Sequence, residues 1–424
     1  MNLIKLNFSY IRRRKLNSVL NTLLLALGVA TIVVLLLFGA QFEESLTRDA
    51  EGIDLVVGAK GSPMQLILSS IYHVDVPTGN IPLPEARKIV AQRAVKKAIP
   101  LALGDSYRGY RIVGTTHDYP MHYGISAGEG RLWEKALEVT VGARAAEEAG
   151  LKIGDEIVSS HGLNDGGAGH HDHALRIVGI LQPSGTVVDR LLLTSIPTVW
   201  DVHEKTASDE DHAEIEEEHD DGHDGEHADH ASEDDIFALD DSEGKEVTTL
   251  LIQYSSPIAA AMFPRFVNSE TNLQAASPAF ETARLYSLLG VGLDAVRAFG
   301  VILIAAAALS VFVALYNALN DRRYDLAVMR TMGASRTKLL LHVLLEGVLM
   351  TLSGAVLGLL LGHAATEMLG LFLREAQQVE LTGWIVLPEE LWIAVLALAV
   401  GVITALLPAI QAYRTDIART LAQR

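Results

Sequence analysis

The chain contains no cysteine among its 424 residues, which excludes disulfide bonds, thiolate metal ligands and a cysteine nucleophile. It also lacks the G-x-x-x-x-G-K-[ST] loop with which P-loop ATPases bind phosphate. No arrangement of residues resembles a hydrolase triad or the carboxylate pair of a glycosidase. The sequence therefore predicts a protein that is not itself an enzyme and holds no cofactor for catalysis.

An excess of negative charge is confined to one segment. Residues 201–246 carry 21 Asp or Glu against two Lys, a net charge of -19, whereas the whole chain has a net charge of -18. The remainder of the chain is therefore close to neutral, at about +1. The acidity describes this segment alone, and no basic patch indicates binding to nucleic acid.

Four long stretches of the sequence are almost free of charge. They are residues 16–42, 298–320, 339–362 and 391–413, and only the third contains ionisable side chains, His342 and Glu346. About 20 helical residues cross a bilayer core, so each stretch is long enough to span it. The alternative, a soluble protein, would have to bury four such helices in its core. The sequence predicts an integral membrane protein with four spans.

Basic residues flank these spans on one side only, apart from isolated exceptions. They stand before the first span, between the second and third, and after the fourth: Lys5, Arg12, Arg13, Arg14 and Lys15; Arg322, Arg323, Arg330, Arg336 and Lys338; Arg414, Arg419 and Arg424. Because Lys and Arg collect on the cytoplasmic side, we expect both termini to be cytoplasmic. The first apolar stretch is longer than that of a signal peptide, so we expect an uncleaved anchor.

The large region between the first and second spans has the pattern of an α+β domain. Short apolar runs at 53–59, 111–115, 191–194 and 248–253 predict strands, and residues 143–149 predict a short helix. Residues 156–159 and 175–181 are expected to form the two arms of a hairpin. The predicted fold class is an α-helical membrane protein with four transmembrane helices and an α+β extracytoplasmic domain.

Two histidine-rich insertions, residues 161–173 and 203–246, interrupt this domain. The candidate metal ligands are His170, His171 and His173 in the first, and His219, His223, His227 and His230 in the second. Imidazole and carboxylate groups together suit zinc, nickel or copper. Dense like charge and low apolar content predict disorder for the second insertion. Three interpretations remain open: incidental histidines in a solvated segment, a weak collector of several metal ions, or one ordered site.

The segment from 322 to 361, RRYDLAVMRTMGASRTKLLLHVLLEGVLMTLSGAVLGLLL, resembles the signature region of the FtsX/MacB-type (type VII) ABC permeases. The matching positions are Asp325, Arg330, Met332, Gly333, Ala334, Ser335, Glu346, Gly354 and Gly358. VGARAAEEAGLKIGDEIV and RIVGIL are similar to the extracytoplasmic core of the same family. The lipoprotein-releasing permeases LolC and LolE belong to this group.

The resemblance implies an architecture, partners and a location. The expected segments are a cytoplasmic N-terminal stretch (1–15), the first span (16–42), a MacB-like periplasmic domain (43–296), the second span (297–320), a cytoplasmic coupling loop (321–338), the third span (339–362), a periplasmic loop (363–389), the fourth span (390–413) and a cytoplasmic tail (414–424). Family members are driven by a cytoplasmic ATPase. The resemblance therefore implies a separate LolD/MacB-like subunit that binds ATP and Mg, a homodimer in the bacterial inner membrane, contact with membrane lipid, and a periplasmic protein or lipoprotein as a further partner.

The coupling loop is the main candidate site. The resemblance assigns ATPase coupling to Arg322, Arg323, Asp325, Leu326, Met329, Arg330, Met332 and Gly333. A short basic amphipathic helix can seat apolar anchors, here Leu326, Met329 and Met332, in a groove of a partner. The alternative is an ordinary positively charged cytoplasmic loop. Two other functions stay open for the whole chain: a metal-sensing or metal-collecting membrane protein, and a scaffold that regulates a periplasmic cell-wall hydrolase.

Overall fold

The computed structural model describes residues 15–161, 169–202, 236–238, 244–321, 323–376 and 381–414. The chain divides into two compact units. The helical unit comprises Met1–Glu43 and Ser287–Arg424, and the extracytoplasmic unit comprises Glu44–Tyr286. Each unit has its own buried apolar clusters.

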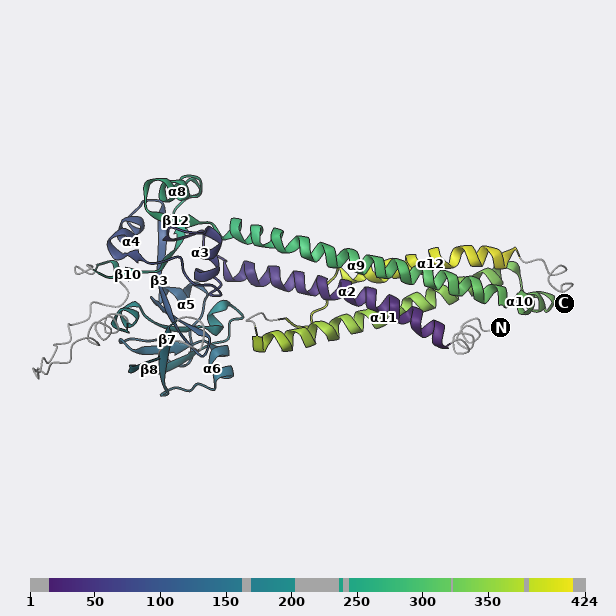
Figure 1. Ribbon diagram of the computed structural model, residues 1–424, viewed down its shortest axis with the longest axis horizontal. Coiled ribbons are helices and arrows are strands. Elements are labelled where there is room, and N and C mark those ends of the chain that lie inside the picture. The colour runs from purple at the N-terminus through teal and green to yellow at the C-terminus, as the bar shows by residue number, and fades with distance from the viewer. Residues whose placement is uncertain are drawn as a thin grey trace, which may run out of the picture. The chain divides into compact units, whose positions relative to one another are not determined.

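The helical unit is built from four long helices and one short one. They are α2 (Lys15–Asp49), α9 (Pro278–Asp321), α10 (Arg323–Thr331), α11 (Arg336–Ala376) and α12 (Glu390–Tyr413). All except α10 are long and apolar enough to cross a membrane, which confirms the four predicted apolar helices among the described residues. The long helices run side by side in this unit (Figure 1).

One expected boundary is wrong. We expected a loop over 363–389, but α11 continues to Ala376. Residues 363–376 (HAATEMLGLFLREA) are rich in Ala, Leu, Met and Glu and contain no Pro, so they favour helix even where the strongly apolar run has ended. Hydropathy locates the part of a helix that suits lipid and does not locate the end of the helix.

Glycines allow α2 and α11 to pack with their backbones close together. A Cβ added at Gly354, Gly358 or Gly362 would lie 2.8, 2.6 or 2.6 Å from a side-chain carbon of α2. The opposing residues are Leu25, Val29 and Val33, respectively. Small residues at this spacing are the usual means of close helix approach in membranes. We call these three glycines the glycine ladder.

The extracytoplasmic unit contains a mixed sheet of ten strands among the described residues, in the order β12-β1-β11-β3-β4-β9-β6-β8-β5, with β7 pairing to β3 and β8. The strands are β1 (Leu55–Ala59), β3 (Val95–Tyr107), β4 (Tyr110–Thr115), β5 (Ala127–Gly130), β6 (Glu138–Val141), β7 (Glu156–His161), β8 (Gly169–Leu181), β9 (Leu192–Ser195), β11 (Thr249–Tyr254) and β12 (Leu273–Ala276). A second small sheet pairs β2 (Ile81–Pro82) with β10 (Glu246–Val247). The predicted α+β class and the predicted β7–β8 hairpin are confirmed.

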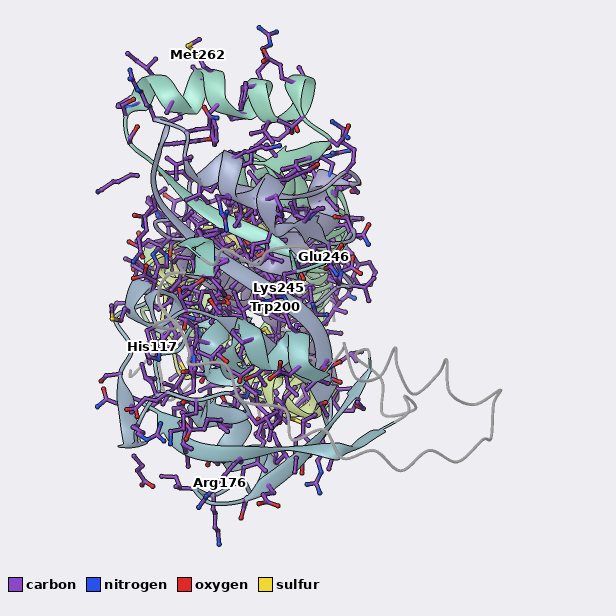
Figure 2. All side chains as sticks on the ribbon, turned by 90° about the vertical axis from the view of Figure 1, so that its left-hand side faces the viewer. His117, Arg176, Trp200, Lys245, Glu246 and Met262 are labelled. Carbon is purple, nitrogen blue, oxygen red and sulfur yellow. The ribbon has the colours of Figure 1, made fainter. Side chains whose placement is uncertain are left out.

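Strand β3 connects two separate apolar cores. Its first half pairs with β11, and its second half pairs with β4 and β7, with a register shift in the β4 pairing between Leu103 and Ser106. One core lies around β1 and β11 with helices α4 (Leu83–Val90) and α8 (Pro257–Glu270). The other lies around β6 and β8 with helix α6 (Ala143–Ala149). Figure 2 shows α8 at one edge of the unit, with Met262 pointing away from it into solvent.

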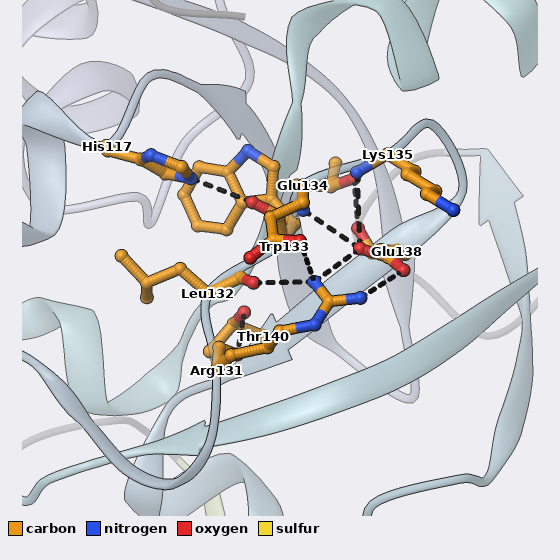
Figure 3. Close-up of polar contacts among 9 residues, drawn as sticks. His117, Arg131, Leu132, Trp133, Glu134, Lys135, Glu138 and Thr140 are labelled. Carbon is orange, nitrogen blue, oxygen red and sulfur yellow. Dashed lines mark hydrogen bonds and ion pairs between the residues drawn. The ribbon is translucent and has the colours of Figure 1, made fainter.

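An ion pair fixes the segment that leads into β6. Arg131 donates two hydrogen bonds to Glu138, of 2.7 and 2.6 Å, and the Glu138 carboxylate also accepts from the backbone N–H groups of Glu134 and Lys135 (Figure 3). These contacts, led by Arg131, lower the pKa of Glu138 to about 2. His117 also contacts this segment, because its Nε2 lies 2.8 Å from the carbonyl oxygen of Trp133.

A buried histidine lies in the same unit. His73 is only 3% exposed, and its Nε2 is 2.9 Å from the hydroxyl of Tyr119, which is fully buried. Burial holds the pKa of His73 well below its ordinary value, and the positive charges of Arg111 and Arg190 act in the same direction. His73 also has a positive φ of 55°, in the left-handed region. The folded protein therefore keeps this imidazole neutral.

Candidate functional site

The sequence M-G-A-S between α10 and α11 forms two helix caps. Gly333 has a φ of +94°, its N–H donates to the carbonyl of Arg330 over 3.1 Å, and the N–H of Ala334 donates to Met329 over 3.0 Å. These two bonds make a Schellman motif, which requires the left-handed residue that glycine supplies. Ser335 then caps α11, because its hydroxyl accepts from the N–H of Lys338 over 3.3 Å. These residues of the signature region thus fix the angle between α10 and α11, the helix that follows it.

The predicted apolar anchors have different environments. Met332 is 81% exposed, at the end of α10. Met329 is half-buried and packs against the cluster formed by Leu319, Leu339, Val343, Ala409 and Ala412. Met329 is therefore placed to hold α10 against the bundle, whereas Met332 is free to contact another subunit. Leu326 lies on α10, but its side chain is outside the described part of the chain, as are those of Arg323 and Asp325 and the whole of Arg322.

Charged and aromatic residues lie on α10 and at the start of α11. Arg330 is half-buried, and its Nε and Nη1 are buried without a hydrogen-bond partner among the described residues. The guanidinium of Arg336 lies 6.0 Å from the ring centre of Tyr413, at the end of α12. Tyr324, at the start of α10, is exposed. Tyr324 was not among the predicted coupling residues, although it is the only aromatic residue in the sequence from 321 to 338.

The predicted metal ligands fall largely outside the described residues. His170, His171 and His173 lie on the backbone of β8, but their side chains are not described, and His219, His223, His227 and His230 are outside the described ranges altogether. Within the part of the chain that the structure describes, no three His, Asp or Glu side chains are grouped so as to hold a metal ion. Zinc binding stays a prediction.

The two ends of the acidic insertion, residues 203–246, lie close together on the domain. Trp200, just before residues 203–235, donates from its indole N–H to the carbonyl of Glu246 over 2.7 Å. The ammonium of Lys245 lies 5.3 Å from the Trp200 ring centre, and the three residues lie together in Figure 2. In the shorter insertion, Ser160 pairs with Gly169 across the β7–β8 hairpin. In each insertion, the chain segments at the two ends are therefore bonded to each other.

Two family models match the chain. The FtsX-like permease C-terminal model matches residues 297–417, and the MacB-like periplasmic core domain matches residues 18–221. The chain belongs to the FtsX/MacB-type permease family. Members of this family are membrane subunits of ABC-type systems, so the permease is the membrane component of such a system and is typically paired with a cytoplasmic ATPase.

One solved structure similar to the permease is the periplasmic region of MacB from Actinobacillus actinomycetemcomitans. The two share 10% sequence identity with a TM-score of 0.33, and the similarity covers 56% of the permease and 95% of the MacB region. No curated protein matches the permease in sequence.

Proposed function

We propose that this permease converts ATP hydrolysis by a separate cytoplasmic ATPase into movement of its extracytoplasmic unit. The exposed Met332 at the α10–α11 turn is the observation that carries the proposal. An apolar side chain in water has no stabilising role in the monomer, but it gains free energy when a partner buries it. The Schellman motif at Gly333 holds this side chain in a fixed position, as a docking element requires.

The proposed topology gives this turn access to the ATPase. Both termini and the α10 segment are cytoplasmic in the proposal, because Lys and Arg gather there. The chain passes from the helical unit to the extracytoplasmic unit within α2 and returns within α9, so both crossings occur inside helices. We further propose a homodimer in the bacterial inner membrane with one LolD/MacB-like ATPase on each protomer.

The decisive experiment is the Met332→Glu substitution, measured in the purified complex as stimulation of ATPase activity against ATPase concentration. A central apolar anchor contributes about 1–3 kcal/mol, so the apparent affinity should fall by roughly 5- to 150-fold. Met262→Glu is the matched control, because Met262 is also exposed but lies on α8 of the extracytoplasmic unit. Unchanged affinity for Met332→Glu would refute the docking role.

Met329 is less suitable for this test. Because it packs against the apolar cluster of the bundle, a charge at this position would also destabilise the helical unit. Leu326→Asp together with Met332→Glu extends the test to the second predicted anchor. A larger loss for this pair than for Met332→Glu alone would support a role for Leu326.

Metal handling is a second candidate, and the composition of the two insertions favours it. We propose that the seven clustered histidines bind several zinc ions at about micromolar affinity, since the composition of the second insertion predicts disorder and ordering such a segment lowers the affinity for each ion. Affinity should fall as the pH drops through about 6.5, because histidine must be neutral to ligate.

The attachment at Trp200 and Glu246 permits a clean deletion. Residues 206–232 can be replaced by a short Gly-Ser linker while the Trp200–Glu246 hydrogen bond and the buried Ile236 remain. Zinc uptake by the full chain, the deletion variant and a variant with Ala at His170, His171 and His173 is measured by calorimetry. Equal uptake by the full chain and the deletion variant would exclude the acidic insertion. No uptake by the full chain would make the histidines incidental, and lipids, peptides or lipoproteins would remain as cargo.

A further inference from the structure

The segment that precedes α12 runs back along the last turns of α11. A Cβ at Gly370 would collide with the carbonyl of Leu381, and a Cβ at Gly383 would collide with the carbonyl of His363. Residues 381–383 thus lie directly on the α11 backbone, antiparallel to it. We call residues 381–392 the strap; it comprises this segment and the first turn of α12.

Polar side chains from three helices satisfy the backbone of the strap. Gln41 of α2 donates to the carbonyl of Thr382 over 3.0 Å and accepts from its N–H over 2.9 Å. Glu367 of α11 accepts from the N–H of Gly383 over 2.8 Å. Glu390 of α12 accepts from the N–H of Leu387 over 2.9 Å.

His363 completes this arrangement. Its Nδ1 is 2.6 Å from the carbonyl of Gly383, and its Nε2 is 3.0 Å from the Glu390 carboxyl group. Gln41, His363, Glu367 and Glu390 form what we call the polar clamp. A backbone whose polar groups are satisfied by protein does not depend on water for its hydrogen bonds.

The other side of the strap is apolar and is not covered by any of the residues that the structure describes. Four large side chains within nine residues are highly exposed: Trp384, Val386, Leu391 and Trp392, at 84%, 74%, 71% and 73%. The strap contains no Lys or Arg, and its only charged residues are Glu389 and Glu390 of the α12 start. Such a concentration of exposed apolar surface requires an apolar environment.

The depth of the polar clamp identifies that environment. His363 lies 24 residues after Leu339, the first residue of the charge-poor run, which is about 36 Å of helix at 1.5 Å per residue. The hydrocarbon core is about 30 Å thick, so the clamp lies just beyond it, in the interfacial layer. The length of α12, from Glu390 to Tyr413, independently gives nearly the same depth. Tryptophan concentrates in this layer because its ring is apolar and its N–H is polar.

A cavity beside the strap is also lined mainly by apolar side chains. It has a volume of about 280 Å³, and Trp392 and Glu389 contribute to its wall together with apolar residues of α2 and α12, including Leu25, Val29, Ile32 and Leu396. Its lining suits hydrocarbon, and it extends from Trp392 at the interfacial layer to Val400, about 12 Å further along α12, so it suits part of an acyl chain.

We propose that the strap is a lipid-binding anchor, which lies in the boundary between phospholipid headgroups and acyl chains and is held there by the polar clamp. The exposed side chains enter the lipid, and the clamp supplies the hydrogen bonds that water would otherwise provide. The anchor fixes the outer ends of α11 and α12 at one depth in the bilayer. This property is independent of the proposed coupling to an ATPase.

Spin labelling in nanodiscs tests the proposal, and the absence of cysteine makes single labels simple to place. The full chain carries one Cys, as Trp384→Cys or Val386→Cys, in discs of phosphatidylethanolamine and phosphatidylglycerol. Relaxation by oxygen reports lipid, and relaxation by a water-soluble nickel chelate reports water. Ile403→Cys is the lipid reference, because Ile403 is exposed on α12, and Glu147→Cys is the water reference on the extracytoplasmic unit.

Both strap labels should be accessible to oxygen and several-fold less accessible to nickel than position 147. Nickel accessibility equal to that of position 147 would place the strap in water and overturn the proposal. Low accessibility to both reagents would mean that a second copy or another protein covers it, which would also overturn the proposal.

A clamp variant tests how the strap is held. Gln41→Leu removes two hydrogen bonds to Thr382 without adding a charge. With the label at position 386, nickel accessibility should rise several-fold because the strap is released toward water. An unchanged value would refute the role of the clamp.

Discussion

Replacing His73 with Asn should make the extracytoplasmic unit more resistant to mild acid. His73 is buried against Tyr119, and its pKa is held well below the ordinary value by burial and by Arg111 and Arg190. In the unfolded chain the same side chain takes up a proton near pH 6.5. The unfolded state therefore binds more protons below this pH, and the free energy of unfolding falls as the pH falls.

The magnitude follows from the number of protons involved. One proton changes the free energy of unfolding by about 1.36 kcal/mol per pH unit, and half of the unfolded chains already carry it at pH 6.5, so lowering the pH from 6.5 to 5.0 should cost up to about 1.6 kcal/mol. The contribution of His73 is fully retained above pH 6.5 and declines below it. Asn cannot be protonated in this range, and it tolerates the left-handed backbone at this position better than most residues do.

The assay is urea unfolding of the fragment 44–286 at several pH values, followed by the fluorescence of Trp133 and Trp200. Tyr119→Phe is the control, because it removes the hydrogen-bond partner of His73 and leaves the histidine in place. The control should lower stability at every pH and keep the wild-type dependence on pH. If His73→Asn loses as much stability as the wild type between pH 6.5 and 5.0, the neutral buried histidine is not the cause.

Two further predictions concern the ion pair at Glu138 and the membrane topology. Glu138→Gln should lower the stability of the fragment by about 1 kcal/mol at pH 7, a value reduced by the partial exposure of Arg131. Because the pKa of Glu138 is lowered to about 2, its stabilising effect is present above the unfolded pKa and is lost as the pH falls from about 4.5 toward 2. The difference in free energy of unfolding between Glu138→Gln and the wild type should therefore shrink at pH 3, as measured by urea unfolding. Asp220→Cys should react with an impermeant maleimide while the inner membrane is intact. Arg419→Cys should react only after the membrane is opened, since basic residues mark the cytoplasmic side. The reverse order of labelling would contradict the proposed topology.

The sequence predicts the parts of the fold that depend on local patterns. Long apolar runs without charge identify the four long helices, and short apolar runs identify β1, β4, β7, β8, β9 and β11. Strand β3 was not predicted, because its sequence VKKAIPLALGDSY contains a Lys pair, a Pro and a Gly that interrupt any pattern. Its pairing depends on partners more than a hundred residues away in β11.

The candidate sites also have parts that local sequence patterns predict and parts that depend on packing between distant segments. The M-G-A-S turn can be predicted, because glycine after a helix and serine before the next are local capping signals. The inward position of Met329 depends on packing with α9, α11 and α12, which a single sequence does not reveal. His363 and Glu390 were not singled out, although each is an ionisable residue at the edge of an apolar run, a position with functional meaning in membrane helices.

The glycine ladder also fixes the register of α2 on α11. A slide of α11 by one turn would move each glycine to the place of its neighbour, four residues away. Depending on the direction, either Met350 would face Leu25 or Thr366 would face Val33, and neither side chain fits where even a Cβ at the native glycine lies 2.6–2.8 Å from its neighbour. The two helices therefore move as one body, and any sliding between spans has to involve the other contacts of the bundle.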